Sequence, residues 1–333
     1  MELKPNQIVC GDCIEILNGV DEPVADLIFA DPPFNIGYKY DKYHDKVEKK
    51  NYIDWTKDWM LACCKALKPS GSFYIAIGDD YAANVKVIAD EIGLTMRNWI
   101  IWHYTFGQQT KAKFARAHTH IFYFVKDKEN YTFNVDAIRV FSDRQKRYKD
   151  KRANPEGKLP DDVWDEHPRL CGTFDEREGW HPCQMPESLL ARIIRVSSNC
   201  GDCILDPFNG SGTTTVVAHK MKRNYIGIEI SKQYVKEAQK RIQQSEEFPV
   251  EGEGEINWTE RLDAELKWLY HENKMSTEKL SDNKYLLGLF TLKFNNRIGF
   301  VNNPCRPEDI KARLTKLRKS AKLGPLRGHV EDK

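Results

Sequence analysis

The sequence alternates short apolar runs rich in β-forming residues with stretches of helical period, and this alternation constrains the fold more than any other feature. The apolar runs are typical of buried strands and comprise residues 7–10, 26–30, 72–77, 99–104, 120–125, 203–205 and 225–230. The helical stretches between them comprise residues 52–67, 81–92, 188–196 and 232–242. Strands that alternate with helices in this way predict an α/β fold built on a parallel, doubly wound sheet.

A polar, basic segment at about 131–178 interrupts the alternation, and we expect it to be an insertion outside the sheet. Its cations include a cluster of six at 144–152: Arg144, Lys146, Arg147, Lys149, Lys151 and Arg152. Farther on, residues 245–255 combine glycine, proline and acidic side chains, a composition that is typical of an exposed linker. We therefore expect a large domain at 1–248, a linker at 249–256 and a small helical module at 257–333.

The module contains apolar residues at helical spacing and ends in a basic helix. Leu262, Leu266 and Leu269 repeat on one face, and the last helix begins at Pro307, a residue that favours the first turn. The cations of the last helix that are candidates for phosphate contacts are Lys311, Arg313 and Lys316. A basic helix is equally compatible with a solvated face, so the pattern leaves both interpretations open.

Composition and charge narrow the class of protein without naming a partner. With 41% hydrophobic and 30% charged residues, the chain is typical of globular proteins. Its net charge of +2 means that a nucleic acid would be held by a local basic patch. No stretch resembles a signal peptide or reaches the ~18 apolar residues that span a bilayer, so we expect a cytoplasmic protein without a membrane partner.

Nine cysteines raise the question of a metal site, because two pairs, at 10–13 and 200–203, have the C-x-x-C spacing. One pair closes a predicted strand and the other precedes one, so parallel strands would hold the pairs at opposite edges of the sheet. We therefore expect free thiols and no bound metal.

A glycine turn at 205–213 carries the first functional signal. It follows a predicted strand and opens a helix, which brings the backbone close to a ligand at Gly210 and Gly212. Glu229 ends the next strand, at the offset where a carboxylate can accept hydrogen bonds from both hydroxyls of a ribose. The turn lacks the third glycine of the dinucleotide fingerprint, so a nucleoside ligand without a pyrophosphate fits better. The expected contacts of this cofactor are Asp206, Pro207, Phe208, Asn209, Gly210, Ser211, Gly212, Thr213 and Glu229.

A second signal is the sequence F-A-D-P-P-F-N at 29–35, directly after a strand and thus at the edge where open α/β sheets bind ligands. The amine of an aromatic base is a poor nucleophile, because its lone pair is delocalised into the ring. The Asp31 carboxylate and the Pro32 carbonyl can each accept one of its N–H groups and favour the pyramidal form. Phe34 offers a face on which an extruded base can stack, although core packing would also explain this aromatic.

Together the two motifs resemble the signatures of the amino methyltransferases of DNA, an Asp-Pro-Pro-aromatic loop and a Phe-x-Gly-x-Gly loop. They occur here as Asp31, Pro32, Pro33 and Phe34 and as residues 208–212. Because the catalytic loop comes first, the order is similar to that of the β class, and the resemblance covers residues 6–243. It implies a Rossmann-like class I methyltransferase fold, S-adenosyl-L-methionine as cofactor, and direct transfer to N6 of a flipped-out adenine in double-stranded DNA.

The resemblance implies further contacts. In the family, a residue matching Asp12 lies by the cofactor adenine, and residues 180–186 are similar to a His-Pro-Thr-Gln-Lys-Pro segment near the methionine end. It thus adds Asp12, Asp31, His181 and Gln184 to the expected cofactor contacts. Cys183 and Met185 depart from that pattern. The basic insertion occupies the place of a target-recognition region, the module is compatible with a helix-turn-helix-like DNA-binding element, and a homodimer and a cognate restriction endonuclease are the further partners that the resemblance suggests.

Other activities remain open at this stage. N4-cytosine methylation uses the same geometry, although the family then tends to have Ser at the position of Asp31. Protein glutamine or RNA methylation would use related sites, and the methyltransferase fold could serve a DNA-binding regulator. C5-cytosine methylation needs a cysteine nucleophile after proline, but the pairs at 182–183 and 304–305 do not follow a strand.

Overall fold

The computed structural model describes residues 2–43, 45–108, 110–146, 148, 150, 152–154, 156–172, 174, 176–245, 256, 258–298, 305–324 and 326. They form two compact units. Unit 1 comprises Met1–Asn134, Asp162–Trp164 and Arg169–Gln244, and unit 2 comprises Val135–Asp161, Asp165–Pro168 and Ser245–Lys333.

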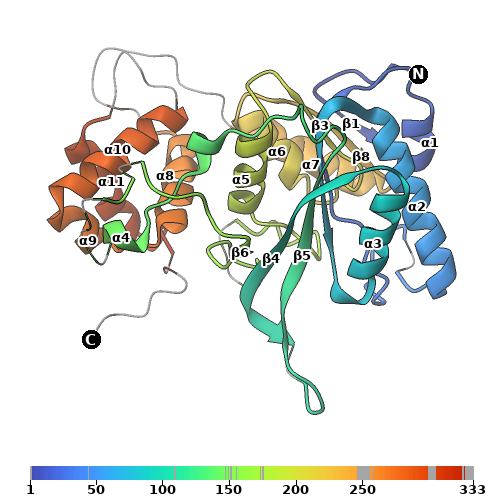
Figure 1. The fold of residues 1–333 in the computed structure, drawn as a ribbon, viewed down its shortest axis with the longest axis horizontal. Coiled ribbons are helices and arrows are strands. Elements are labelled where there is room, and N and C mark those ends of the chain that lie inside the picture. The colour runs from blue at the N-terminus through green and yellow to red at the C-terminus, as the bar shows by residue number, and fades with distance from the viewer. Residues whose placement is uncertain are drawn as a thin grey trace. The chain divides into compact units, whose positions relative to one another are not determined.

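Unit 1 is built on an eight-stranded sheet in the order β1-β8-β7-β2-β3-β5-β4-β6 (Figure 1). Its strands are β1 (Gln7–Cys10), β2 (Ala25–Ala30), β3 (Leu67–Ile77), β4 (Thr95–Gln108), β5 (Arg116–Val125), β6 (Val163–Trp164), β7 (Cys203–Asp206) and β8 (Asn224–Glu229). Only β5 runs antiparallel to its two neighbours, β3 and β4. The predicted Rossmann-like, mostly parallel α/β fold is confirmed.

Two groups of helices cover the sheet (Figure 1). One group contains α1 (Cys13–Asn18), α2 (Lys49–Ala66) and α3 (Asp79–Glu91), and the other contains α5 (Glu187–Ser197), α6 (Thr213–Lys220) and α7 (Lys232–Gln244). Fully buried side chains such as Ile28, Phe73 and Trp59 form the core between the first group and the sheet. The Trp59 indole also packs edge-on against Phe208, with the ring centroids 5.2 Å apart, so the core supports the glycine turn directly.

The antiparallel β4–β5 hairpin extends beyond the sheet (Figure 1). Ile77, the last residue of β3, pairs with His120, whereas β5 already begins at Arg116. The hairpin therefore continues past the carboxyl end of β3, the edge of the sheet where the loop after β2 also lies. Phe114 near its tip is 99% exposed.

Unit 2 is helical and contains α8 (Glu260–Asn273), α9 (Thr277–Asp282), α10 (Lys284–Ile298) and α11 (Pro307–Lys319), together with the short helices η1 (Val135–Ile138) and α4 (Asp143–Lys146). Ile310, Leu314 and Leu317 of α11 are buried, as the apolar pattern predicts. Inside the unit, the Arg297 guanidinium is 5% exposed and pairs with Glu265 and Glu272.

The expected domain division differs from these units in one respect. We expected residues 131–178 to belong with the sheet domain, but residues 135–161 and 165–168 group with the C-terminal helices. Phe141 explains this grouping, because its buried ring packs into the helical core and its backbone N–H donates to Asn273 Oδ1 at 3.0 Å. Lys293 of α10 adds a bond to the carbonyl of Glu156, 2.6 Å away.

Two further observations concern the membrane and the thiols. Among the residues described, no helix has the length and apolar character needed to cross a bilayer. All nine cysteines are free thiols. Cys10 and Cys203 pair with opposite ends of β8, so the two C-x-x-C segments are held apart, as parallel strands require.

Candidate active site

Four adjacent parallel strands end at the residues that the sequence singles out. Asp12 follows β1, Glu229 ends β8, Asp206 ends β7 and Asp31 follows β2. The registers place these ends side by side, since Cys10 pairs with Glu229 and Ile28 pairs with Leu205. The catalytic loop near residue 31 and the glycine turn near residue 210 therefore meet at one edge of the sheet, although about 180 residues separate them.

These loops enclose a cavity with about 1010 Å³ of atom-free space, its open mouth included. The predicted site residues that line it are Asp12, Asp31, Pro33, His181, Asp206, Pro207, Phe208, Asn209, Gly210, Ser211, Thr213 and Glu229. The lining residues that sequence reasoning missed include Tyr40, Asp41, Lys42, Tyr43, Trp55, Ser231 and Tyr234.

The glycine turn requires glycine for steric reasons. Gly210 and Gly212 have φ of 45° and 77°, in the left-handed region that side chains disfavour. A Cβ on Gly210 would lie 3.0 Å from His181 Nε2, and one on Gly212 would lie 2.7 Å from the Cβ of Ala238. Gly210 thus leaves room for the His181 ring, and Gly212 allows the start of α6 to pack closely on α7.

Carboxylates dominate the electrostatics of the cavity. Burial and the neighbouring Asp206 raise the pKa of Asp31 to about 8, and burial raises the pKa of Asp206 to about 7. Burial also raises the pKa of Glu229, although this carboxylate accepts hydrogen bonds from the backbone N–H groups of Gly210 and Ser231, both at 2.8 Å. Burial and mutual repulsion therefore disfavour the charged forms, and a cationic ligand would relieve this repulsion.

His181 contributes a neutral ring to the same cavity. Burial lowers the pKa of His181 to about 4, and the positive charge of Arg241 acts in the same direction. Its Nδ1 lies 2.9 Å from the carbonyl oxygen of Cys183, which fixes the orientation of the ring. Tyr234 packs edge-on against it, with the ring centroids 4.8 Å apart. At neutral pH this wall therefore adds no charge that would repel a cation.

The catalytic loop presents two acceptors that have no donor. Among the described residues, none donates a hydrogen bond to the half-buried Asp31 carboxyl or to the carbonyl of Pro32. The Pro33 carbonyl differs, because it accepts a bond of 2.6 Å from the hydroxyl of Tyr52 on α2. Asp31, which lines the cavity, therefore remains available for an N–H donor from a ligand. Pro32 is buried and does not line the cavity, and its carbonyl accepts no bond from the described residues.

The segment that follows the catalytic loop is held by one buried carboxylate. Asp45 accepts bonds from the backbone N–H groups of Asn35 at 2.6 Å and Tyr38 at 2.9 Å. Asn35 itself has φ of 58° and donates from Nδ2 to the hydroxyl of Tyr81 at 2.7 Å. These bonds give the loop after Asp31 a defined path, and the next residues, Tyr40 to Tyr43, reach the cavity wall. The signal that could have found them is this cluster of aromatics directly after the catalytic motif.

Four predicted site residues do not line the cavity: Pro32, Phe34, Gln184 and Gly212. Phe34 is half buried against the core, and its ring packs near Gly78. Both ends of the buried Gln184 amide, an expected cofactor contact, form hydrogen bonds inside its own loop. Its Oε1 accepts from the Glu178 N–H at 2.8 Å, and its Nε2 donates to the Glu176 carbonyl at 2.7 Å.

The predicted DNA-binding residues in unit 2 fall into three groups. Arg144, Lys311 and Lys316 are exposed. Arg152 pairs with Asp150 at 3.0 Å, and Arg313 pairs with Asp263 and lies over the ring of Trp258, so Arg313 serves packing within the unit. Lys146 ends α4, whereas Arg147, Lys149 and Lys151 lie outside the described residues.

Comparison with known proteins agrees with this arrangement. The family model described as DNA methylase, of N6 and N4 methyltransferases, matches residues 25–240. The chain is 34% identical over 263 residues to the type II methyltransferase M.HpaI of Haemophilus parainfluenzae, covering 78% of each protein. It is 38% identical over 252 residues to the DNA adenine methyltransferase YhdJ of Escherichia coli K12, covering 73% of this chain and 85% of that protein.

Solved structures support the fold. The M1.HpyAVI complex with S-adenosyl-L-methionine (SAM) matches 71% of this chain and 98% of its own, with 24% identity and a TM-score of 0.51. The cytosine-N4-specific PvuII DNA methyltransferase matches 80% of this chain and 92% of its own, with 21% identity and a TM-score of 0.54.

The cavity also fits the cofactor of this family, which is SAM. Its acidic groups suit a ligand that carries a sulfonium and an ammonium, and Glu229 retains acceptor capacity for hydroxyl groups. The glycine turn leaves space that any Cβ at Gly210 would fill. By its motifs, its sheet topology and its relatives of more than 30% identity, the chain belongs to the DNA methylase family of N6 and N4 methyltransferases.

Proposed function

We propose that this protein is a site-specific DNA methyltransferase that methylates N6 of a flipped-out adenine in double-stranded DNA. Two hydrogen-bond acceptors directly after the carboxyl end of β2 carry the proposal, the Asp31 carboxyl and the Pro32 carbonyl. Neither accepts a bond from the described residues. The exocyclic amine of a base has two N–H donors, and the two acceptors can each receive a hydrogen bond from one of them.

The residues act on the amine in the following way. Each acceptor receives a hydrogen bond from one N–H group of the amine. These two bonds favour a pyramidal nitrogen, whose lone pair can then attack the methyl group. SAM, when bound, supplies an electrophilic methyl group on a sulfonium. Asp31, whose pKa burial raises to about 8, acts in its ionised form: the carboxylate accepts one N–H of the amine and takes up the proton that the nitrogen loses on methylation. Tyr52 holds the loop in place through the Pro33 carbonyl, 2.6 Å away.

Adenine is favoured over cytosine by the first residue of the motif. Asp31 stands where N4-cytosine enzymes of the resembled family tend to have Ser. The name of YhdJ describes an adenine methyltransferase, and that protein is 38% identical to this chain. Methylation of N4 of cytosine is the alternative, because its amine presents the same two N–H groups.

Two surfaces support DNA as the substrate. The β4–β5 hairpin stands at the catalytic edge of the sheet and exposes Lys111, Lys113 and Phe114 at its tip. A strand rises by about 3.3 Å per residue, so β5 extends about 13 Å from His120 to its first residue, Arg116, and the tip follows beyond it. A two-stranded ribbon fits the major groove, and an exposed phenylalanine can wedge between base steps. The second surface is α11 of the helical module, which we propose to be a DNA-binding element through Lys311 and Lys316.

The DNA surfaces can be tested by charge removal. We expect the double variant Lys111→Gln, Lys113→Gln to bind DNA several-fold more weakly. The slope of log affinity against log salt concentration should become shallower by about one to two, because each phosphate contact contributes about 0.9 to that slope. Lys311→Gln with Lys316→Gln should act in the same way. Lys128→Gln is the matched control, an exposed lysine at the opposite end of β5. An unchanged slope in either double variant removes that surface from the proposal.

Transfer of a labelled methyl group from SAM to unmodified duplex DNA tests the activity itself. We expect the label in N6-methyladenine after nucleoside digestion. Label in N4-methylcytosine would move the assignment to the alternative base. DNA binding without transfer would instead indicate a regulator on a methyltransferase fold.

The setting that we propose is that of a restriction–modification enzyme in the cytoplasm. Relatives such as M.HpaI are named type II methyltransferases, which supports a cognate restriction endonuclease as partner. A homodimer is part of the same proposal, and the mass of the protein in solution tests it.

A further inference from the structure

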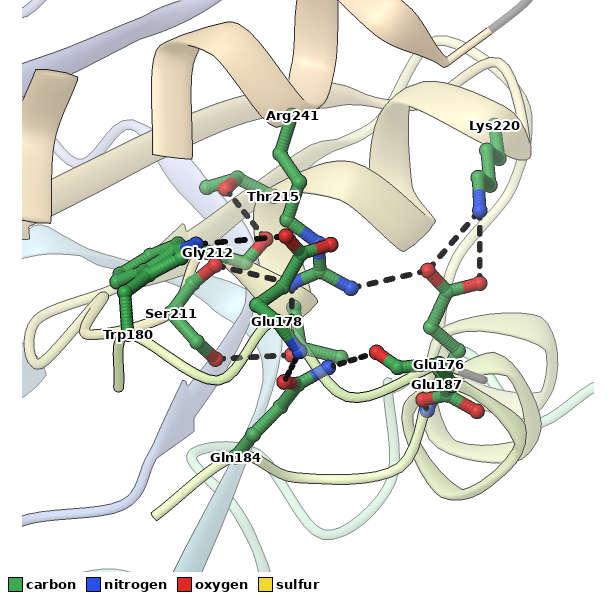
Figure 2. Close-up of polar contacts among 11 residues, drawn as sticks. Glu176, Glu178, Trp180, Gln184, Glu187, Ser211, Gly212, Thr215, Lys220 and Arg241 are labelled. Atoms are coloured by element: carbon green, nitrogen blue, oxygen red, sulfur yellow. Dashed lines mark hydrogen bonds and ion pairs between the residues drawn. The ribbon is translucent and has the colours of Figure 1, made fainter. Parts of the chain in front are cut away.

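Arg241 on α7 binds two other parts of the chain, the stretch from Glu178 to Glu187 and the glycine turn (Figure 2). Its Nη1 donates to the Ser211 carbonyl at 2.9 Å and to Thr213 Oγ1 at 3.2 Å, both in the glycine turn. Its Nε lies 2.9 Å from Glu178 Oε1, and its Nη2 donates to Glu187 Oε1 at 3.1 Å. One guanidinium thus connects the glycine turn, the loop before His181 and the start of α5.

The two segments that Arg241 connects form facing parts of the cavity wall. Ser211 and Thr213 line the cavity from the glycine turn, and His181 lines it from the other segment. Arg241 itself is buried and does not line the cavity. It therefore reaches a ligand only through its neighbours, and the planar fork of a guanidinium can hold several acceptors in a fixed geometry.

We propose that Arg241 is a positioning residue for the cofactor, which holds the glycine turn and the His181 loop at the separation that SAM requires. Glu178 is the acceptor on the loop side, and the loop is braced further. The Gln184 side chain accepts a hydrogen bond from the Glu178 N–H and donates one to the Glu176 carbonyl. Trp180 Nε1 donates to Glu178 Oε2 at 3.3 Å (Figure 2). The rigid loop transmits the position of Glu178 to His181.

The network also predicts that the protein folds without this guanidinium. Glu187 is paired a second time, with Lys220 Nζ at 2.8 and 2.9 Å from its two carboxylate oxygens. Glu178 is 34% exposed on its side chain and can be solvated. Removal of Arg241 thus leaves neither carboxylate buried and unpaired, the situation that makes loss of one partner severely destabilising.

A positioning role differs from a Coulombic one in its effect on ligand charge. A buried cation near the cavity repels the sulfonium of SAM, so its removal by itself would strengthen the binding of SAM relative to that of S-adenosylhomocysteine, which lacks the sulfonium charge. Loss of positioning lowers the affinity for both ligands equally, because both contain the same adenosine and amino acid portions. The ratio of the two dissociation constants therefore separates the two roles.

The experiment measures both dissociation constants by calorimetry for wild type, Arg241→Met, Arg241→Lys and the control Lys240→Met. Lys240 is the adjacent residue of α7, 49% exposed and paired with Glu237. We expect Arg241→Met to raise both constants about tenfold or more, with their ratio unchanged, and Arg241→Lys to recover only part of the loss. Lys240→Met should leave both constants at the wild-type value. DNA affinity should stay unchanged in all variants.

The outcome that overturns the proposal is a pair of dissociation constants within about twofold of wild type in a folded Arg241→Met protein. A change in their ratio in favour of SAM would assign a Coulombic role instead. Should Arg241→Met not fold, Glu178→Gln provides the test, because it removes the charge that pairs with Arg241, and Trp180→Phe controls for loss of the Trp180 bond to the same carboxylate. Both constants should then rise about threefold, and unchanged values would refute the proposal.

Discussion

Replacement of Asp31 by alanine is expected to reduce methyl transfer by about 10³-fold or more, while the dissociation constant for SAM changes little. The carboxyl has no donor among the described residues, so its bond to the target amine forms only when the base is bound. Its contribution therefore belongs to the transition state, and the loss should appear in kcat. Single-turnover kinetics with saturating SAM and DNA measure the effect. Turnover near the wild-type rate would refute the assigned role.

Asp31→Asn provides the control, because the amide keeps the size of the side chain and removes its charge. Burial raises the pKa of Asp31 from 3.8 to about 8, so the folded protein binds this proton more tightly than the unfolded chain. Stability from this group is thus complete below about pH 4 and is lost as the pH rises to about 8. We expect Asn to raise the Tm of the cofactor-free protein by several degrees at pH 9 and by less near pH 5. An equal Tm at pH 9 would contradict the unfavourable burial of this charge.

Substitution of Gly212 by alanine is expected to weaken SAM binding by about 100-fold. A Cβ at this position would lie 2.7 Å from the Cβ of Ala238, so the glycine turn and α7 would have to move apart. The turn supplies Ser211, Gly210 and Asp206 to the cavity, and a shift of about 1 Å in such a site is costly. Calorimetric titration of the variant with SAM checks this result.

Gly201→Ala is the matched control for this substitution. Gly201 has φ of 87°, also left-handed, but an added Cβ would meet nothing within 4 Å. It therefore carries the backbone strain of about 1–2 kcal/mol without the collision. We expect SAM affinity to be retained in this variant, and its Tm loss to be smaller than that of Gly212→Ala, which adds the collision to the strain. Equal affinities in the two variants would show that the collision with Ala238 does not matter.

The Asp31 predictions rest on the acidic character of the cavity, whereas the Gly212 prediction rests on a steric collision. Asp31, Asp206 and Glu229 all have a raised pKa, and burial is the largest cause for each. The neutral His181 ring and the Arg241 network complete the walls without placing a cation in the cavity. The fold thus buries carboxyl groups whose charged forms are destabilised. Shifted pKa values of this kind are common at functional sites.

Much of the site was predictable because the relevant signals are local. The period of apolar residues reports which face of a strand or helix is buried, and the predicted runs match β1, β2 and β8 closely. The order of the motifs then follows from the rule that ligands bind at the carboxyl ends of parallel strands. Asp31, Asp206 and Glu229 were placed at one edge on this basis, and the registers of the sheet confirm it.

Features that depend on contacts between distant residues were decided only by the tertiary structure. Phe141 lies in a segment whose polar composition predicts an insertion on the sheet, yet its ring packs with the C-terminal helices. Gln184 matches a family motif, but its amide bonds its own loop, and Arg241 carries no motif although it connects both cavity walls. Periodicity and spacing record the local environment of a residue. The choice of a partner depends on packing and on satisfying buried polar groups, whether that partner lies 6 residues away, as for Gln184, or 132, as for Phe141.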